Sequence, residues 1–220
     1  HWKAYYEKGR SLRLQRKYTE AAQAFKVASN QAPDDPYPVV ELGDVYMHIQ
    51  EFGKAAQEYQ RGTELLPNDQ DIHLKAAKAY QFAKEAKKAA IILKGVEGRF
   101  SSSTVLQKEI GLLQLQLGDT LDAQRYLEMC YSEQKNDPRV LVGLGDIYTH
   151  GNRFDDAYKM YNTAMSMLDD KNECRVALGR LYLLKSSPQQ AQAYLTEVLQ
   201  SKPNFRHVNR YYADARFMVG

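Results

Sequence analysis

Two aspartate–histidine pairs are the residues of this sequence that come closest to a chemical site. Asp44 and His48 lie four residues apart, as do Asp146 and His150, within two nearly identical stretches. On a helix this spacing places both side chains on one face, where the pair stabilises the helix and the histidine lies near its negative end. The same side chains could bind a metal ion or a ligand, but a metal site usually needs more than two protein ligands. We therefore expect helix-stabilising pairs and no bound metal.

No other group of residues has the spacing of a catalytic or cofactor site. The sequence contains no glycine-rich phosphate loop, no nucleophile elbow and no cluster of cysteine and histidine. His73 and His207 have no partner at a fixed spacing. The sequence therefore predicts a protein that is not an enzyme and has no cofactor.

The two cysteines, Cys130 and Cys174, are predicted to be free thiols. Cys130 takes a small-residue position that suits a buried structural thiol, and Cys174 comes near the start of a predicted helix. A helix pair separates them, so we expect the distance between their Cα atoms to exceed the roughly 7 Å that a disulfide can span. Free thiols are typical of a reducing compartment, so we expect the protein in the cytoplasm.

Small residues recur with a period of 34 along the whole chain. They are Gly9, Gly43, Ala77, Gly111, Gly145, Gly179 and Ala213. An alanine lies 12 residues beyond each of the first six, at Ala21, Ala55, Ala89, Ala123, Ala157 and Ala191. A fixed period of this length indicates stacked supersecondary units rather than one closed core. Because an unpacked glycine inside a helix costs about 1 kcal/mol, its recurrence indicates that these positions allow close helix packing.

Each period is predicted to form two helices joined by a short turn. We number each unit so that its recurrent small residue is position 8. Residues 1–220, taken as a single domain, then divide into repeats 2–35, 36–69, 70–103, 104–137, 138–171 and 172–205 and a partial seventh repeat or capping helix at 206–220. Asp35–Pro36 and Asp137–Pro138 support these boundaries, because each places a capping carboxylate before a proline that suits the first turn of a helix.

The residue types at these positions resemble those of tetratricopeptide repeats. The first unit carries Tyr5, Gly9, Leu12, Ala21, Phe25, Ala28 and Pro33 at the family's positions, and the fifth carries Leu141, Leu144, Gly145, Tyr148, Ala157, Tyr161 and Ala164. The resemblance covers residues 2–205 and part of a seventh unit, and it implies an all-α fold, a right-handed α-solenoid of stacked helix-turn-helix repeats. The third unit departs from the pattern at Ala77 and Ser101, so we expect a softer joint in residues 95–104.

The resemblance also implies a binding surface, because the first helices of the family's repeats line a concave groove. Carried onto this sequence, the partner-binding groove consists of Tyr6, Arg10, Arg13, Tyr37, Val40, Asp44, Met47, Leu74, Lys78, Phe82, Lys108, Leu112, Leu115, Val142, Asp146, Val176 and Arg180. The groove is predicted to be basic at its N-terminal mouth and apolar with scattered charges beyond it, one of them Glu173 in the sixth repeat.

These features predict a scaffold or adaptor that binds a peptide or helical segment of a partner protein, with the basic mouth orienting an acidic flank. One alternative is the regulatory region of a larger signalling protein or enzyme, which the start at His1 and the apolar end at Phe217 would fit. Another is binding of single-stranded RNA, since 16 tyrosines could stack on bases. Asp44 and Asp146 on the expected groove oppose RNA.

Composition limits the partners further. The 30 Lys and Arg exceed the 27 Asp and Glu by only three, and this net charge is too small to indicate nucleic acid or a membrane surface. No apolar run approaches the roughly 20 residues that span a bilayer. We therefore expect a protein or peptide partner, no nucleic acid and no membrane span.

Overall fold

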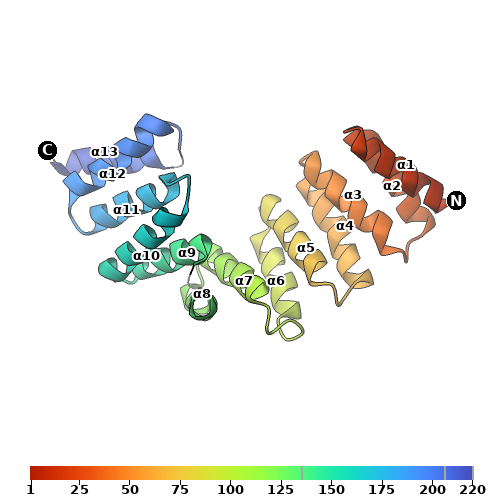
Figure 1. Ribbon diagram of the computed structural model, residues 1–220, viewed down its shortest axis with the longest axis horizontal. Helices are drawn as coiled ribbons and strands as arrows, with labels where there is room; N and C mark the ends of the chain where they lie inside the picture. Colours follow the sequence, from red (N-terminus) through yellow and green to blue (C-terminus); the bar gives the residue numbers. More distant parts are fainter. Residues whose placement is uncertain (135, 206, 220) are drawn as a thin grey trace. The chain divides into compact units, whose positions relative to one another are not determined.

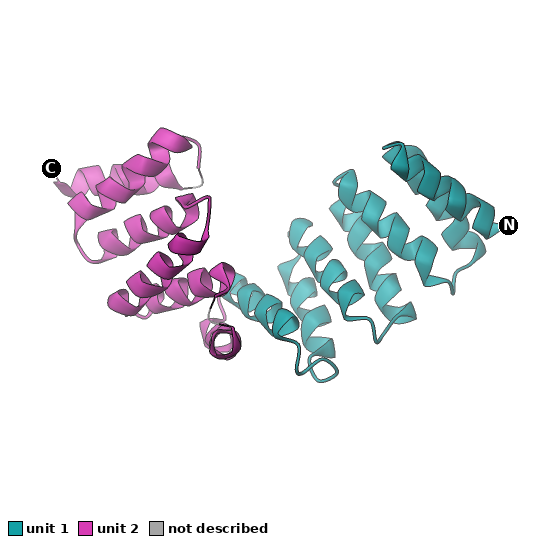
Figure 2. Ribbon diagram, in the orientation of Figure 1, with its two compact units in different colours: residues 1–117 teal, residues 118–220 magenta. Residues whose placement is uncertain are grey.

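The computed structural model of the protein describes residues 1–134, 136–205 and 207–219, and these ranges contain thirteen α-helices and no strand (Figure 1). The helices form two compact units, unit 1 at residues 1–117 and unit 2 at residues 118–220 (Figure 2). The fold is an all-α solenoid of helix-turn-helix repeats. The start at residue 206 and the end at residue 220 that the sequence predicts for the seventh unit lie outside the described residues.

Unit 1 contains three helix pairs and one further helix. Its helices are α1 (Trp2–Leu14), α2 (Tyr18–Gln31), α3 (Pro36–His48), α4 (Phe52–Leu65), α5 (Gln70–Phe82), α6 (Ala86–Val96) and α7 (Thr104–Leu117). Each helix packs against the next one along the chain, and α5 also contacts α7. The odd-numbered helices begin at residues 2, 36, 70 and 104, where the sequence starts its repeats.

Unit 2 continues the same alternation. Its helices are α8 (Thr120–Glu133), α9 (Pro138–His150), α10 (Phe154–Met167), α11 (Asn172–Leu184), α12 (Pro188–Ser201) and α13 (Val208–Val219). Consecutive helices pack against each other, and α11 additionally contacts both α9 and α13. The first helices of these three repeats therefore form one face of unit 2.

Aspartate side chains cap three of the first helices. Asp35, Asp69 and Asp137 each accept a hydrogen bond from the backbone N–H two residues further on, at 3.0, 2.9 and 2.9 Å. Pro36 and Pro138 follow the first and third of these caps and begin α3 and α9. Because the first N–H groups of a helix have no partner inside it, these caps fix where each repeat starts.

The recurrent glycines lie where the two helices of a pair touch. A Cβ atom on Gly43 would lie 2.7 Å from Cε1 of Tyr59, and one on Gly145 would lie 2.5 Å from Cε1 of Tyr161. The other two described contacts of this kind are Gly9 against Phe25 and Gly179 against Leu195. The prediction that these glycines serve packing is confirmed at all four positions.

A residue in the left-handed conformation occupies the turn inside each helix pair. These residues and their φ angles are Arg16 (60°), Gln50 (61°), Lys84 (63°), Gly118 (85°), Asn152 (57°) and Ser186 (54°). All share one position of the repeat. Since only glycine adopts this conformation without strain, the repeated helix packing determines the turn more strongly than the residue type does.

We expect the substitution Gln50→Gly to raise the free energy of unfolding by about 0.5–1 kcal/mol, because it relieves the strain of a positive φ. Gln57→Gly is the matched control. Gln57 is exposed inside α4, where glycine should lower that free energy by about 1 kcal/mol. Urea unfolding followed by circular dichroism measures both, and equal losses in the two variants would contradict the assignment of strain to Gln50.

The boundary between the compact units does not fall in the segment that the sequence predicts to be soft. It follows Leu117, whereas the expected joint covered residues 95–104. Two contacts join the segment after α6 to α5 and to the turn before it. Arg99 Nη1 donates a hydrogen bond to the carbonyl of Pro67, and the ring of Phe100 lies 6.1 Å from that of His73. That residues 95–104 form a softer joint stays a prediction.

Two general features of the described residues bear on function. None of the described helices is long and apolar enough to cross a membrane. No group of three or more His, Cys, Asp or Glu side chains among the described residues is arranged to hold a metal ion. The pockets and surfaces of the described residues are therefore the candidate binding sites.

Candidate binding site

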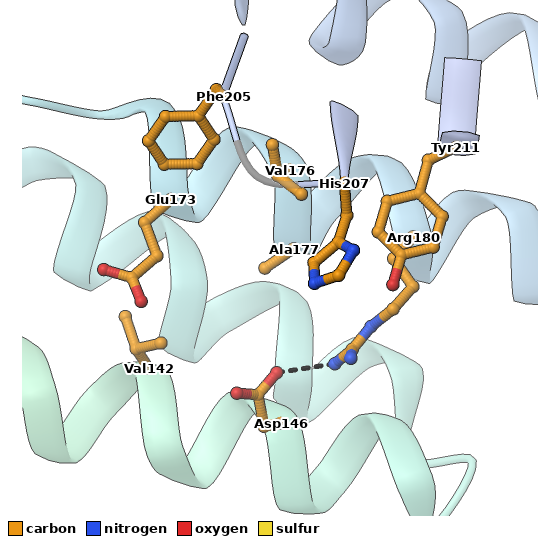
Figure 3. A pocket seen from close by; sticks show the side chains of 9 residues that line it. All are labelled: Val142, Asp146, Glu173, Val176, Ala177, Arg180, Phe205, His207 and Tyr211. Carbon is orange, nitrogen blue, oxygen red and sulfur yellow. Dashed lines mark hydrogen bonds and ion pairs between the residues drawn. The ribbon is translucent and has the colours of Figure 1, made fainter. Parts of the chain in front are cut away.

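A pocket of about 460 Å³ opens on unit 2 (Figure 3). It is lined by Val142, Asp146, Glu173, Val176, Ala177, Arg180, Phe205, His207 and Tyr211. These residues come from α9, from α11, from the turn after α12 and from α13. The pocket thus lies on the face that the first helices of three consecutive repeats form.

Helix geometry explains how each wall is built. Val142 and Asp146 are four residues apart on α9, and Val176 and Arg180 have the same spacing on α11, so each pair lies on one face of its helix. The contact between α9 and α11 brings the two faces together. The pocket floor between them is open because Ala177 carries only a methyl group.

Asp146 is the centre of a hydrogen-bond network beside the pocket. Its Oδ1 accepts hydrogen bonds from Tyr161 Oη at 2.8 Å and from Arg180 Nη2 at 2.6 Å. Tyr161 Oη also lies 3.1 Å from Thr149 Oγ1. Burial raises the pKa of Tyr161, and the neighbouring Asp146 carboxylate raises it further, so this hydroxyl stays protonated and donates.

The expected aspartate–histidine pairs do not form. Asp44 accepts from Tyr59 Oη at 2.5 Å and from Lys75 Nζ at 2.8 Å, while His48 stacks on the ring of Tyr18 at 4.9 Å. The fifth repeat follows the same rule, with Tyr161 and Arg180 in place of the histidine. The aspartate follows the packing glycine directly, and so it faces the tyrosine of the second helix. A lysine or arginine of the next repeat then pairs with the aspartate in place of the histidine.

The two networks differ in the residue that carries the positive charge. Lys75 and Ala177 occupy the same position of the repeat, and so do Lys78 and Arg180. In unit 1 the side chain of Lys75 reaches the aspartate, whereas in unit 2 the small Ala177 leaves that space open and Arg180 makes the contact.

The other wall of the pocket is peculiar to the last repeats. Phe205, His207 and Tyr211 correspond in the repeat to Ser103, Val105 and Glu109. His207 has a positive φ of 64°, in the turn that leads into α13. The pocket therefore depends on residue types that the earlier repeats do not carry at the same positions.

The structure places the predicted groove residues on the first helices, and none of them is fully buried. Four of them, Val142, Asp146, Val176 and Arg180, meet in the pocket of unit 2. The exposed ones are Arg10, Tyr37, Lys78 and Phe82, and the half-buried ones outside the pocket are Tyr6, Arg13, Val40, Asp44, Met47, Leu74, Lys108, Leu112 and Leu115. Their contact with a partner stays a prediction.

Glu173, which the sequence also places at a groove position, lines the pocket as well, whereas four other lining residues do not appear in the predicted groove. Ala177 lies on α11 beside predicted residues, and helical spacing alone could have added it. Phe205, His207 and Tyr211 come from the turn after α12 and from α13. Phe205 ends the sixth repeat, and His207 and Tyr211 belong to the partial seventh repeat; none of the three was among the predicted groove residues.

The basic mouth of the predicted groove is partly neutralised. Arg13 Nη1 lies 2.9 Å from Glu41 Oε2, and Arg10 Nη1 lies 3.3 Å from Glu7 Oε1. Burial raises the pKa of Glu41 while the Arg13 guanidinium opposes that shift. Arg13 therefore links α1 to α3, and its charge is shared with a partly buried carboxylate.

Both cysteines are free thiols, as the sequence predicts, and both are buried, which the sequence predicts for Cys130 alone. Cys174 lies within the apolar contacts of α9 and α10, next to the pocket-lining Glu173. Burial raises the pKa of its thiol to about 11, with the carboxylates of Glu173 and Asp146 adding to the shift. A thiol with such a pKa is a weak nucleophile at neutral pH, which supports a structural role.

Comparison with known proteins defines the class and then the family. The helix pairs, the packing glycines and the 34-residue period are those of an α-solenoid of helical repeats. The sequence model of the Tetratricopeptide repeat matches residues 12–77 and 114–174, more than half of the chain. The chain belongs to the tetratricopeptide repeat family. No curated protein matches it in sequence.

Solved structures agree with the fold. A chain of the APC/C hetero-tetramer Cut9–Hcn1 is similar with a TM-score of 0.73 and 18% identity, over 98% of this chain and 43% of that one. This chain thus spans less than half of that neighbour. PilF of Pseudomonas aeruginosa gives a TM-score of 0.72 and 16% identity, over 97% of both chains. YrrB, described as a repeat protein of this family with an unusual peptide-binding site, gives 0.62 and 17%, over 86% of this chain and 97% of that one. At such identities the likeness concerns the fold.

Proposed function

We propose that the chain is a non-catalytic scaffold that binds a segment of a partner protein on the face formed by its first helices. One observation carries the proposal. The pocket on α9, α11 and α13 combines apolar walls with charged side chains at its ends. Its volume of about 460 Å³ lies within the range of pockets that hold ligands, and four of its residues occupy groove positions of the family.

The physical basis of binding is burial of apolar surface. Val142, Val176 and Phe205 offer apolar atoms to a partner side chain, and their burial contributes about 25 cal/mol per Å² before the costs of association. The charged groups would set orientation rather than affinity. Asp146, Tyr161 and Arg180 already bind one another, so this network provides no nucleophile next to a free base.

A partner with an acidic flank for the basic mouth stays a prediction. The ion pair between Arg13 and Glu41 leaves Arg10, Arg16 and Lys17 as the exposed cations of that region. The pocket of unit 2 is independent of this region, so we base the test of function on the pocket.

Selection of binders from a phage-displayed library of randomised peptides tests the proposal. We expect peptides that bind the wild-type chain and lose about tenfold or more in affinity for the variant Ala177→Lys. This substitution introduces the residue that the third repeat carries at the same position, and its side chain fills the pocket. Fluorescence anisotropy with the selected peptides measures the affinities.

The variant Ala193→Lys is the matched control, because Ala193 is exposed on α12 and does not line the pocket. It adds the same charge and the same side chain, and we expect it to leave the affinity unchanged. Failure to select any peptide would overturn the proposed function. Peptides that bind both variants equally well would place the binding surface outside the pocket.

A further inference from the structure

We propose that the pocket of unit 2 recognises a basic side chain, lysine or arginine, of the partner segment and binds it at Glu173. This inference rests on the proposed function, because it names the chemistry of the group that enters the pocket. It follows from the charges of the lining residues, from the shape of an amphipathic cation, and from a comparison with unit 1.

Glu173 is the carboxylate of the pocket that is left for a ligand. The other carboxylate, Asp146, is bound by Arg180 and by Tyr161. Glu173 is exposed, and within the described residues it forms no hydrogen bond and no ion pair. With Asp146 and Arg180 cancelling each other, the charge that remains on these three groups is negative, and a cation is its complement.

The two sides of the pocket differ, which determines where a cation can bind. Figure 3 shows Glu173 and Phe205 on one side and Arg180, His207 and Tyr211 on the other. The guanidinium of Arg180 repels a second cation from its side. The ring of Phe205 attracts a cation to the side of Glu173, because an aromatic face carries partial negative charge.

The apolar walls suit the stem of a basic side chain. Lysine and arginine carry several methylene groups before the charged head, and they cover apolar surface with the stem while the head stays hydrated or paired. Val142 and Val176 line the pocket near Glu173 and provide that surface. A small ammonium ion without a stem would gain only the ion pair.

Unit 1 contains a basic side chain in the corresponding place. Lys75 has the repeat position of Ala177, and its Nζ lies 2.8 Å from Asp44 and 5.7 Å from the ring centroid of Tyr59. A lysine of the chain thus lies between two first helices, against a carboxylate and an aromatic ring. In unit 2 Arg180 takes the place of the Lys75 ammonium at the aspartate, while Ala177 leaves open the space that the stem of Lys75 fills. The stem of a partner's basic side chain can occupy this space with its charged head at Glu173.

The test uses the phage-selected peptides that lose affinity for Ala177→Lys. We expect them to share a lysine or arginine at one position. Synthetic peptides with norleucine there keep the stem and lose the charge, and we expect a loss of affinity of about 3- to 10-fold. Glu173→Gln should cause the same loss, and combining both changes should cause no additional one.

Charge reversal provides the sharpest measurement. Glu173→Lys should select peptides with aspartate or glutamate at the shared position and bind the original peptides least. The control Asp214→Lys changes the net charge equally, on an exposed residue of α13 that does not line the pocket, and should leave the preference unchanged.

The outcomes separate the two proposals. Pocket-binding peptides without a shared basic residue, or norleucine peptides that bind as well as the original ones, would overturn the basic occupant and leave the scaffold function standing. Peptides that are insensitive to Ala177→Lys would likewise remove the occupant from this pocket. If no peptide is selected at all, the scaffold function fails, and the inference fails with it.

Discussion

We expect the substitution Gly43→Ala to lower the free energy of unfolding by about 2 kcal/mol. The new methyl group would lie 2.7 Å from Cε1 and 2.8 Å from Cδ1 of Tyr59. The ring cannot move aside at low cost, because its hydroxyl is bound to Asp44 at 2.5 Å and the residue is buried. The midpoint of urea unfolding, followed by circular dichroism, measures the loss.

The variant Gly53→Ala is the control, because Gly53 lies in α4 with nothing within 4 Å of its added Cβ atom. There alanine should raise the free energy of unfolding by about 0.5–1 kcal/mol through helix propensity. Opposite signs for two identical substitutions would identify helix packing as the cause. A stabilising effect of Gly43→Ala would contradict the packing role.

A compensating variant extends this test. The third repeat carries Ala77 and Leu93 at the positions of Gly43 and Tyr59, and both residues are buried. The double variant Gly43→Ala with Tyr59→Leu reproduces that pair. We expect it to be less destabilised than the sum of its single changes, because the shorter side chain accepts the methyl group. An additive result would show that the two positions do not interact.

The sequence predicted the starts of the six complete repeats and the glycine packing. These features are local, and each of them recurs at the same position of several repeats. Gly43 and Gly145 share one phase, and the caps at Asp35 and Asp137 mark the same boundary. Because several repeats of one chain agree, the repeat pattern alone supports the prediction.

Features that depend on contacts between repeats were not predictable from the pattern. The left-handed residues Gln50 and Lys84 have side chains that give no hint of a positive φ. The partners of Asp146 lie 15 and 34 residues away, while the sequence offered a histidine only four away. Local spacing therefore favoured the wrong neighbour.

Only some of the residues that line the pocket could be predicted from the repeat pattern. Val142 and Val176 lie at groove positions of the family pattern, and the structure brings them together. Phe205 comes from the turn after α12, at the end of the last complete repeat, and Tyr211 comes from α13 beyond it. Breaks in a periodic pattern are places where one surface of a repeat protein becomes different from the others, and these residues create such a difference.

The glycine, the tyrosine and the aspartate of the second and fifth repeats act as one unit. Glycine allows the tyrosine ring to press against the first helix, and the ring position brings the hydroxyl to the next residue, the aspartate. The aspartate in turn binds a cation of the following repeat. Packing inside one repeat is thus linked to the interface with the next, where a solenoid derives much of its stability.

This link predicts a large effect of Asp146→Ala, about 2–3 kcal/mol of lost unfolding free energy. The substitution leaves the Tyr161 hydroxyl without its acceptor and the Arg180 guanidinium, whose side chain is 28% exposed, without a counter-charge. Arg180 Nε is already buried without an acceptor among the described residues, which adds to the cost. Urea unfolding of the full chain gives the number.

Two further variants show whether the lost ion pair is the cause. Asp155→Ala removes a carboxylate that is 90% exposed and pairs with Lys185 on the surface, so we expect a loss of only about 0.5 kcal/mol. Arg180→Met combined with Asp146→Ala removes the unpaired charge while keeping an apolar stem. This double variant should be more stable than Asp146→Ala alone, because an unpaired cation costs more than a missing pair. If it is less stable, the contacts of Arg180 other than its pair with Asp146 support the interface between the fifth and sixth repeats.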